Sequence, residues 1–367
     1  MQESNVIRFT KNDIVMKHLF TILTLVVMCA SKAFATTYIV NNNTSNPGQF
    51  YYLQAAIDSA DTGDTLYIQP SPVSYGDASL YKGLTLIGIG FKPIKDFPSI
   101  ASIGTITMSQ NLSGATFIGL KIGALMCPCN GYGDWHTTAN IHAINCDLGY
   151  IGDSYSSSCY GFNIMNNIVV ENCIVRNISL PSNGNNFLFQ NNVIYAYSIW
   201  LGGSSTTNVT VKNNLFIYDY QVNTLGGNAV VFENNIFYRF SPYSGSLTNC
   251  VFNNNLTYAT AFDEILTGTN TGINNIIAQD PLFVNYVTTA NPAYNPLYNY
   301  RLQELSPAHN AGTDGTDIGP YGNNITFSET GENVQLPVIR QMNLLNSTVP
   351  SSGILNVQIK ATSAKTE

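Results

Sequence analysis

A short pattern built around two consecutive asparagines recurs through the middle of the chain. It reads apolar, polar, Asn, Asn, apolar, and the steps from one first Asn to the next are 19, 22, 21, 20 and 20 residues. A period near 20 residues, with short apolar runs and no helical periodicity, predicts a solenoid of stacked β coils. A leucine-rich repeat has this length but needs a leucine-dominated consensus, and a propeller blade needs about twice the length. The first Asn of each copy is Asn172 (followed by Cys173), Asn191, Asn213, Asn234 and Asn254, with a weaker copy at Asn274.

The repeated Asn has two structural uses. Asn tolerates left-handed backbone geometry, so it suits a bend between two strands. Its side-chain amide can also bond to the same amide one coil away, which gives a ladder that satisfies buried polar groups. We therefore interpret Asn172, Asn191, Asn213, Asn234 and Asn254 as structural residues, and the coils between residues 160 and 260 as a scaffold.

Alignment of the repeats places residues in columns, because stacked strands lie about 4.8 Å apart. The column two residues after the second Asn holds Arg176, Tyr195, Ile217, Tyr238 and Tyr258. Aromatic faces on a flat sheet suit stacking against sugar rings, although aromatic columns also stabilise neighbouring coils. Tyr195, Tyr238 and Tyr258 are therefore candidate ligand-binding residues.

Cys146 and Cys173 occupy equivalent positions of neighbouring coils. Their predicted Cα separation of about 4.8 Å lies within the range that a disulfide can span. A stack of small buried thiols would satisfy the same spacing, and the sequence leaves both arrangements open.

The N-terminal region resembles a secretory signal from Met16 to Ala35. Leu19 to Ala30 is an apolar run, and Ala33-Phe34-Ala35 matches a small-x-small cleavage pattern. The run of about a dozen residues is shorter than the ~20 that a membrane span needs. We expect residues 1–15 to be an upstream extension and the mature chain to be secreted or held at the cell surface, without a membrane span after cleavage.

The composition narrows the partners of the mature chain. Removal of residues 1–35 takes away four basic and two acidic residues, which leaves 11 Lys and Arg against 20 Asp and Glu. An acidic surface argues against nucleic acid and anionic membranes as partners. Abundant neutral polar side chains are typical of a β-rich extracellular protein. We expect the mature chain to be a monomer.

The segment before the repeats predicts a cap. Leu53, Ala56, Ile57 and Ala60 have the spacing of one buried helical stripe. Strand-like segments lie on both sides of this helix, at Thr37 to Val40 and Thr65 to Ile68. A single helix followed by short strands suggests a cap over the open end of a larger β structure.

The chain resembles the pectin-lyase-like right-handed β-helix superfamily, and within it a secreted bacterial branch of uncharacterised β-helix repeat proteins. The resemblance covers about residues 38–324 and rests on three segments: residues 53–68, which are similar to the opening cap and first strand; residues 84–88; and the closing motifs around Asp280-Pro281 and Ser306-Pro307. It implies an all-β, single-stranded right-handed parallel β-helix with a short N-terminal capping helix. The expected domains are 1–35, the helix at 36–324, and a strand-like tail at 325–367. The superfamily hosts many activities, so the fold alone does not identify one.

The regular coils lack the side chains of two reactions found on this kind of scaffold. The residue before the first Asn of each copy forms a polar column that should face water: Glu171, Gln190, Lys212, Glu233 and Asn253. A calcium-dependent lyase needs several clustered carboxylates, yet Glu171 and Glu233 in this polar column are three coils apart, about 14 Å by strand spacing. A glycoside hydrolase of the two-carboxylate kind needs Asp or Glu residues within reach on neighbouring coils. We therefore predict no cofactor and no metal; calcium in particular lacks a supporting carboxylate cluster.

Residues 124–160 break the rhythm of the repeat. The spacing stretches to 26 residues between Gly119 and Asn145 and to 27 between Asn145 and Asn172. Function on solenoids concentrates in such insertions. The candidate catalytic residues of this insertion are Asp134, His136, Asp147 and Asp153, and Trp135 is the candidate for stacking on a sugar ring. The alternative is a surface loop pinned by its cysteines.

These observations favour a secreted β-helix that binds polysaccharide or a cell-surface or matrix component. A polysaccharide lyase or glycoside hydrolase acting at the 124–160 insertion is the first alternative. A structural stalk of a surface assembly is the second.

Overall fold

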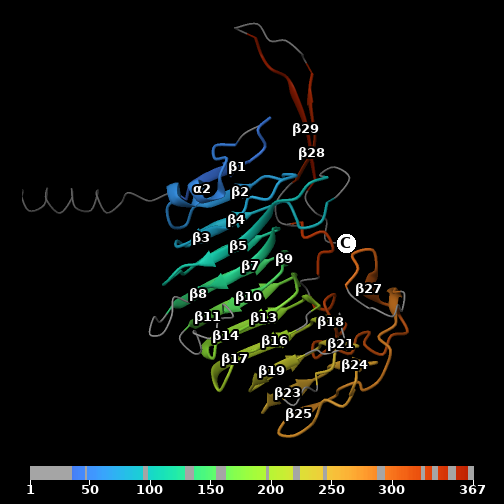
Figure 1. Cartoon of the computed structure of the whole chain (residues 1–367). Helices are drawn as coiled ribbons and strands as arrows, with labels where there is room; N and C mark the ends of the chain where they lie inside the picture. The colour runs from blue at the N-terminus through green and yellow to red at the C-terminus, as the bar shows by residue number, and fades with distance from the viewer. Residues whose placement is uncertain are drawn as a thin grey trace, which may run out of the picture. The chain divides into compact units, whose positions relative to one another are not determined.

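The computed structural model describes residues 35–45, 48–93, 98–128, 136–153, 163–195, 198–217, 224–242, 246–286, 294–323, 327–332, 338–345 and 353–362. The chain divides into two compact units, residues 1–36 and 37–367. The second unit is a solenoid of parallel strands, as the Asn-Asn repeat predicts (Figure 1). No helix among the described residues is both long and apolar enough to cross a membrane.

Each regular coil contributes three strands, which stack on their equivalents in the next coil to form three rows. The first row is a sheet of eleven strands that ends in β25. Its members are β1 (Thr37–Val40), β2 (Thr65–Ile68), β4 (Thr85–Ile87), β6 (Thr116–Ile118), β8 (Thr137–Ile144), β11 (Ile164–Glu171), β14 (Asn183–Gln190), β17 (Ser205–Lys212), β20 (Val230–Glu233), β23 (Val251–Asn253) and β25 (Thr271–Ile273).

The second and third rows belong to one sheet, because the longer strands β5 (Ser102–Met108) and β7 (Lys121–Cys127) connect them. Lys121 of β7 pairs with Asp147 in the second row, and Leu125 pairs with Ile151 in the third. The second row holds β9 (Asp147–Leu148), β12 (Ile174–Val175), β15 (Val193–Tyr195), β18 (Leu215–Ile217), β21 (Ile236–Tyr238) and β24 (Leu256–Tyr258). The third holds β3 (Ala78–Leu80), β10 (Ile151–Asp153), β13 (Ile178–Ser179), β16 (Ser198–Trp200), β19 (Thr224–Asn228) and β22 (Leu247–Thr248).

The corner between the first and second rows explains the Asn-Asn pair. The first Asn of each pair has left-handed backbone geometry, with φ between 52° and 57° from Asn172 to Asn274. The second Asn points inward and builds the predicted asparagine ladder, which we call the inner ladder. Its amides hydrogen-bond from Asn192 to Asn214, Asn235, Asn255 and Asn275 at 2.9, 3.0, 2.9 and 3.2 Å. The first Asn of the pair therefore forms the left-handed bend and the second Asn forms the ladder, whereas the sequence analysis assigned both uses to one Asn.

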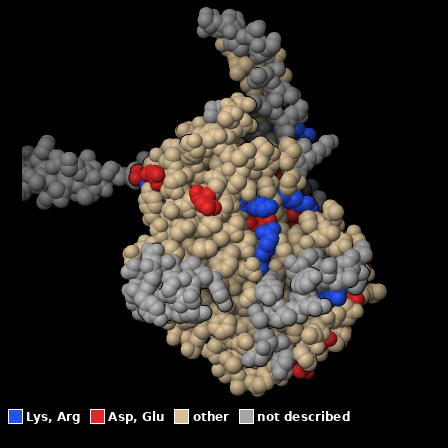
Figure 2. Space-filling view, viewed as in Figure 1, with Lys and Arg blue, Asp and Glu red and all other residues tan. Residues whose placement is uncertain are grey.

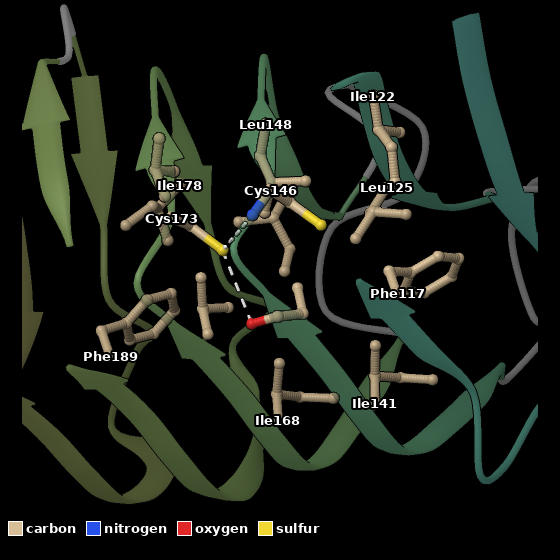
Figure 3. Close-up of a cluster of buried hydrophobic side chains, with 14 of the residues drawn as sticks. Phe117, Ile122, Leu125, Ile141, Cys146, Leu148, Ile168, Cys173, Ile178 and Phe189 are labelled. Atoms are coloured by element: carbon tan, nitrogen blue, oxygen red, sulfur yellow. Dashed lines mark hydrogen bonds between the residues drawn. The ribbon is translucent and has the colours of Figure 1, made fainter. Parts of the chain in front are cut away.

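Cys146 and Cys173 take the place of the second Asn in two earlier coils (Figure 3). Both are free thiols in this structure, as are Cys127 and Cys250. The backbone N–H of Cys146 donates to Cys173 Sγ at 3.3 Å, and the N–H of Cys173 donates to Asn192 Oδ1 at 2.9 Å. The Cys173 sulfur thus continues the inner ladder as an acceptor, while the Cys146 thiol donates to the Ile144 carbonyl at 3.3 Å. Burial raises the pKa of the Cys173 thiol, which keeps it protonated.

Apolar side chains fill the interior between the rows. Phe232 and Phe252 stack with ring centroids 4.6 Å apart, and Phe216 and Phe237 do so at 4.7 Å. These pairs lie at equivalent positions of adjacent coils, so the strand spacing itself imposes the stacking. At the N-terminal end, helix α2 (Leu53–Ser59) buries Leu53, Ala56 and Ile57, which agrees with the predicted capping helix.

The chain after the last coil returns along the outside of the solenoid (Figure 1). We call the described parts of residues 280–332 the returning segment. It includes the antiparallel pair β26 (Phe283–Asn285) and β27 (Asn299–Leu302), and it continues past the predicted boundary at residue 324. Beyond it, β28 (Val338–Leu344) and β29 (Val357–Thr362) form an antiparallel hairpin.

The first Asn of the pair holds the returning segment in place. The Asn254 amide donates to the Ala311 carbonyl at 2.9 Å, and Asn191 donates to the carbonyls of Pro320 and Gly322 at 3.0 Å each. Further along, Asn145 donates to the Glu332 carbonyl at 3.1 Å. Later residues of the segment contact earlier coils, so the segment runs back along the solenoid in the direction opposite to the order of the coils.

Candidate functional site

The tyrosine column is covered by the returning segment. Tyr238 is 4% exposed, and its ring contacts Phe283 and Tyr286 at centroid distances of 5.4 and 5.0 Å. Around it the outer face of the second row forms a second hydrophobic core, which includes Val193, Leu215 and Ile236. The ring face of Tyr238 is therefore not offered to a ligand. The predicted stacking surface is instead a packing surface for the returning segment.

Tyr195 belongs to a stack that crosses from the solenoid to the returning segment. The guanidinium of Arg176 lies 5.3 Å from the Tyr195 ring centroid. Tyr195 stacks on Tyr294 at 5.6 Å, and Tyr294 stacks on Tyr300 at 5.7 Å. Tyr258 is partly buried, with its ring centroid 5.8 Å from that of Tyr238. All three tyrosines of the predicted column thus pack against other aromatic rings.

Asp147, one of the predicted catalytic residues, is paired with Arg176. Its two carboxylate oxygens lie 2.9 and 3.1 Å from the guanidinium nitrogens, and the residue is 7% exposed. Lys121 lies beside Asp147 on the neighbouring strand. The ion pair with Asp147 therefore positions the Arg176 guanidinium beside the Tyr195 ring.

The returning segment adds charges to this region. Arg301 lies over the Tyr321 ring at 4.5 Å and 3.8 Å from the Glu329 carboxylate. Burial and then the charges of its neighbours, Asp147 and Glu329 among them, raise the pKa of Tyr294. We call Lys121, Asp147, Arg176, Tyr195, Tyr294, Arg301, Tyr321 and Glu329 the Asp147 cluster. Figure 2 shows Lys and Arg gathered on this face of the molecule with Asp and Glu beside them.

The other predicted catalytic residues lie elsewhere. Asp134 and Trp135 are outside the described residues. Asp153, at the end of β10, accepts a hydrogen bond from the Asn163 amide. His136 is 3% exposed, and its two ring nitrogens have no hydrogen-bond partner among the described residues. Asp147 and Asp153 therefore have different partners, and His136 is a buried residue immediately before β8.

A thiol lies in the same region as His136. Cys127 donates to the Thr138 hydroxyl at 3.3 Å, and burial raises its pKa to about 12. Such a thiol stays protonated and is a poor metal ligand or nucleophile. Across the described part of the chain, no three His, Cys, Asp or Glu side chains gather in an arrangement that could hold a metal ion.

The outer face of the first row carries a small polar network. His142 Nε2 lies 2.8 Å from Glu171 Oε1, and the Gln190 amide donates to Glu171 Oε2 at 2.6 Å. The hydrogen bond with His142 is the main cause that lowers the pKa of Glu171. Three coils after Glu171, Glu233 accepts a hydrogen bond from Thr313 of the returning segment. The predicted polar column thus faces outward and in part holds the returning segment.

The third row exposes an aromatic side chain that the sequence analysis missed. Trp200, at the end of β16, is 40% exposed. Two carbons of its benzo ring occupy the place where a Cβ of Gly226 would project, at 2.4 Å. A side chain at position 226 would displace the indole, so glycine there lets the ring lie over the next coil. Ser179 and Gly226 are the strand partners of Trp200.

A second asparagine ladder, which we call the outer ladder, runs along a kink in the first-row strands. Asn140, Asn167, Asn186 and Asn208 have φ between 54° and 62° and are exposed. The amides of Asn167 and Asn186 each donate to the preceding rung at 2.9 Å. The sequence signal was present, because each of these residues lies five positions before the first Asn of a pair. Ala229 occupies the same position in one coil, also at positive φ.

Comparison with known proteins adds no family to this geometry. No protein-family model matches the chain, and no curated protein matches it.

Proposed function

We propose that the chain is a secreted β-helix that binds polysaccharide, with the exposed Trp200 on the third row as its central contact. The observation that carries the proposal is the open indole over Gly226 on a regular sheet face. Tryptophan is the side chain best suited to stacking on the apolar face of a sugar ring, because it combines a large area with few rotatable bonds. The secretion signal predicted for residues 16–35 would bring this surface to extracellular glycans.

Binding is favoured over catalysis by the state of the candidate acid and base groups. Asp147 is engaged by Arg176, and Asp153 by Asn163. The rings of the tyrosine column are likewise used for packing. The proposed site therefore shifts from the tyrosine column, where the sequence placed it, to the exposed third row.

The test is polysaccharide binding by the purified chain on a glycan array, repeated with Trp200→Ala. Loss of one stacking contact worth about 1.4 kcal/mol corresponds to about a tenfold loss of affinity. Tyr81→Ala is the matched control, because Tyr81 is 46% exposed and lies near the N-terminal cap. Binding that Trp200→Ala leaves intact would contradict the assignment of the site, and absence of binding to every polysaccharide would contradict the function.

A further inference from the structure

The outer ladder and the third row from β13 to β22, which carries Trp200, belong to a charge-free part of the solenoid. Residues 177–189, 198–211, 224–232 and 246–250 contain no Asp, Glu, Lys or Arg. These stretches form β13, β14, β16, most of β17, β19, most of β20 and β22. The cations of the Asp147 cluster lie instead beside the second row. In Figure 2 the surface over β13, β16 and β19 shows no Lys, Arg, Asp or Glu.

The outer ladder presents unused hydrogen-bonding capacity to solvent. A side-chain amide has two N–H groups and an oxygen with two lone pairs. Asn167 and Asn186 use one N–H and one lone pair each within the ladder. Their exposed amides therefore retain donors and acceptors in a mixture that matches the hydroxyl groups of a sugar.

A second column of polar side chains lies next to the ladder and stiffens it. Asn185 accepts hydrogen bonds from the Thr207 hydroxyl at 3.0 Å and from the Asn208 amide at 2.7 Å. Two coils further, Asn228 accepts from Thr248 and Asn249 at 3.0 Å each. Side chains held in this way lose little rotamer freedom when a ligand binds, which favours affinity.

The spacing of the rungs fits a repeating ligand. Rungs follow the strands and are therefore about 4.8 Å apart along the solenoid axis, close to the length of one pyranose unit. A polysaccharide chain that lies parallel to the axis would meet an equivalent amide at each sugar. A free monosaccharide would meet only one or two rungs and gain little from the repetition.

From the absence of charge, the outer ladder and its spacing, we propose that the ligand is an uncharged polysaccharide whose chain runs parallel to the solenoid axis over the outer ladder. This inference rests on the proposed function and names the substrate class. Acidic polysaccharides are excluded from this surface because their carboxylates would lose hydration without gaining a cationic partner.

The test compares the affinities of the full chain for uncharged and for acidic polysaccharides. A panel of soluble β-glucan, mannan and galactan is titrated in parallel with polygalacturonate and alginate, at low salt and at about 1 M NaCl, where the Debye length is about 3 Å. We expect at least one uncharged polysaccharide to bind with an affinity that salt changes less than twofold. Preference for an acidic polysaccharide, with binding lost at high salt, would overturn this inference while leaving the proposed function intact. Absence of binding to all probes would overturn both.

A matched pair of substitutions tests the location. Asn185→Asp keeps the acceptor oxygen for Thr207 and Asn208 and adds one negative charge to the charge-free surface. Asn253→Asp makes the same change in the polar column, which already holds Glu233 on the paired strand. We expect about a tenfold loss of affinity for Asn185→Asp only, with unfolding temperatures of both variants within a few degrees of the parent. Equal affinities of the two variants would overturn the assignment of the outer ladder as the binding surface.

Discussion

At the scale of single residues, the solenoid depends on asparagines that lie within a few positions of one another and have different structural roles. Asn213 accepts a left-handed bend, Asn214 lies in the inner ladder, and Asn208 lies in the outer ladder. The two ladder residues should contribute differently to the free energy of unfolding, because Asn214 is fully buried while Asn208 is exposed. Removing a partner from a buried network leaves other buried groups unsatisfied, which costs more than losing an exposed bond.

Asn214→Ala should therefore lower the free energy of unfolding by about 3 kcal/mol or more. The change removes the acceptor for the Asn192 backbone N–H and amide, and the donor to Asn235. Asn186→Ala, on the exposed outer ladder, should lower the free energy of unfolding by about 1 kcal/mol. Denaturant unfolding of the two variants measures the difference, and equal losses would contradict the division between the ladders.

Ala229 is the rung at which the outer ladder lacks its Asn. It holds φ +53° without a side chain that favours this region, and left-handed geometry costs a non-glycine residue about 1–2 kcal/mol. Ala229→Asn should raise the free energy of unfolding by about 1 kcal/mol, while Ala229→Ser should not, because serine supplies no amide for the ladder. A thermal melt that ranks Ala229→Asn at or below the parent would refute this account of the kink.

Glu171 makes stability depend on pH at the outer face of the first row. Its pKa is lowered in the folded state, so the stability it adds is complete above the ordinary glutamate pKa of about 4.3. That contribution is lost as the pH falls through the lowered value. Glu171→Gln should flatten the acid limb of the stability profile, whereas the exposed Glu304→Gln should leave it unchanged. An acid limb as steep in Glu171→Gln as in the parent would count against the His142–Glu171 contact.

At the scale of elements, the returning segment decides which faces of the solenoid are available. The second row is apolar on its outer face, and the returning segment covers it with Phe283, Tyr300, Ile318 and Phe327. The first Asn of four pairs also anchors this segment by side-chain hydrogen bonds, at Asn191, Asn213, Asn234 and Asn254. The corner asparagines and the apolar outer face of the second row thus both hold the returning segment against the solenoid.

Tyr300→Ala should detach part of this segment. Tyr300 is 2% exposed and contacts Phe283, Tyr286, Tyr294 and Tyr298, so truncation should cost about 3–5 kcal/mol. Limited proteolysis should then cleave within residues 294–332 faster than in the parent. Leu305→Ala is the control, because Leu305 is 87% exposed. Unchanged proteolysis in Tyr300→Ala would mean that the aromatic core does not hold the segment.

The elements of the solenoid could be predicted from the sequence because a repeat fixes its own register. The left-handed corners from Asn172 to Asn274, the asparagine ladder and the capping helix at Leu53–Ser59 follow from spacing and side-chain type. The path of the returning segment did not follow, because its contacts join residues far apart in the sequence, such as Tyr238 with Phe283 and Asn191 with Pro320. The same limitation placed the ligand surface on Tyr238, whose burial depends on those contacts.

At the scale of the whole solenoid unit, the faces differ in chemistry. The second row is apolar and covered, and the Asp147 cluster concentrates charge beside it. The outer ladder and the third row from β13 to β22 carry no Asp, Glu, Lys or Arg. Trp200 could not be found by periodicity, because it occurs in one coil only and its exposure depends on the glycine of the next. We therefore assign polysaccharide binding to the outer ladder and the third row, and a structural role to the second row, which the returning segment covers.

Hydrogen–deuterium exchange with and without a bound uncharged polysaccharide tests this division most directly. Exchange reports local opening along the chain, so a ligand should slow exchange in β14, β16 and β17 and leave residues 294–332 unchanged. Protection confined to the returning segment and the Asp147 cluster, with none in β14, β16 and β17, would contradict the account.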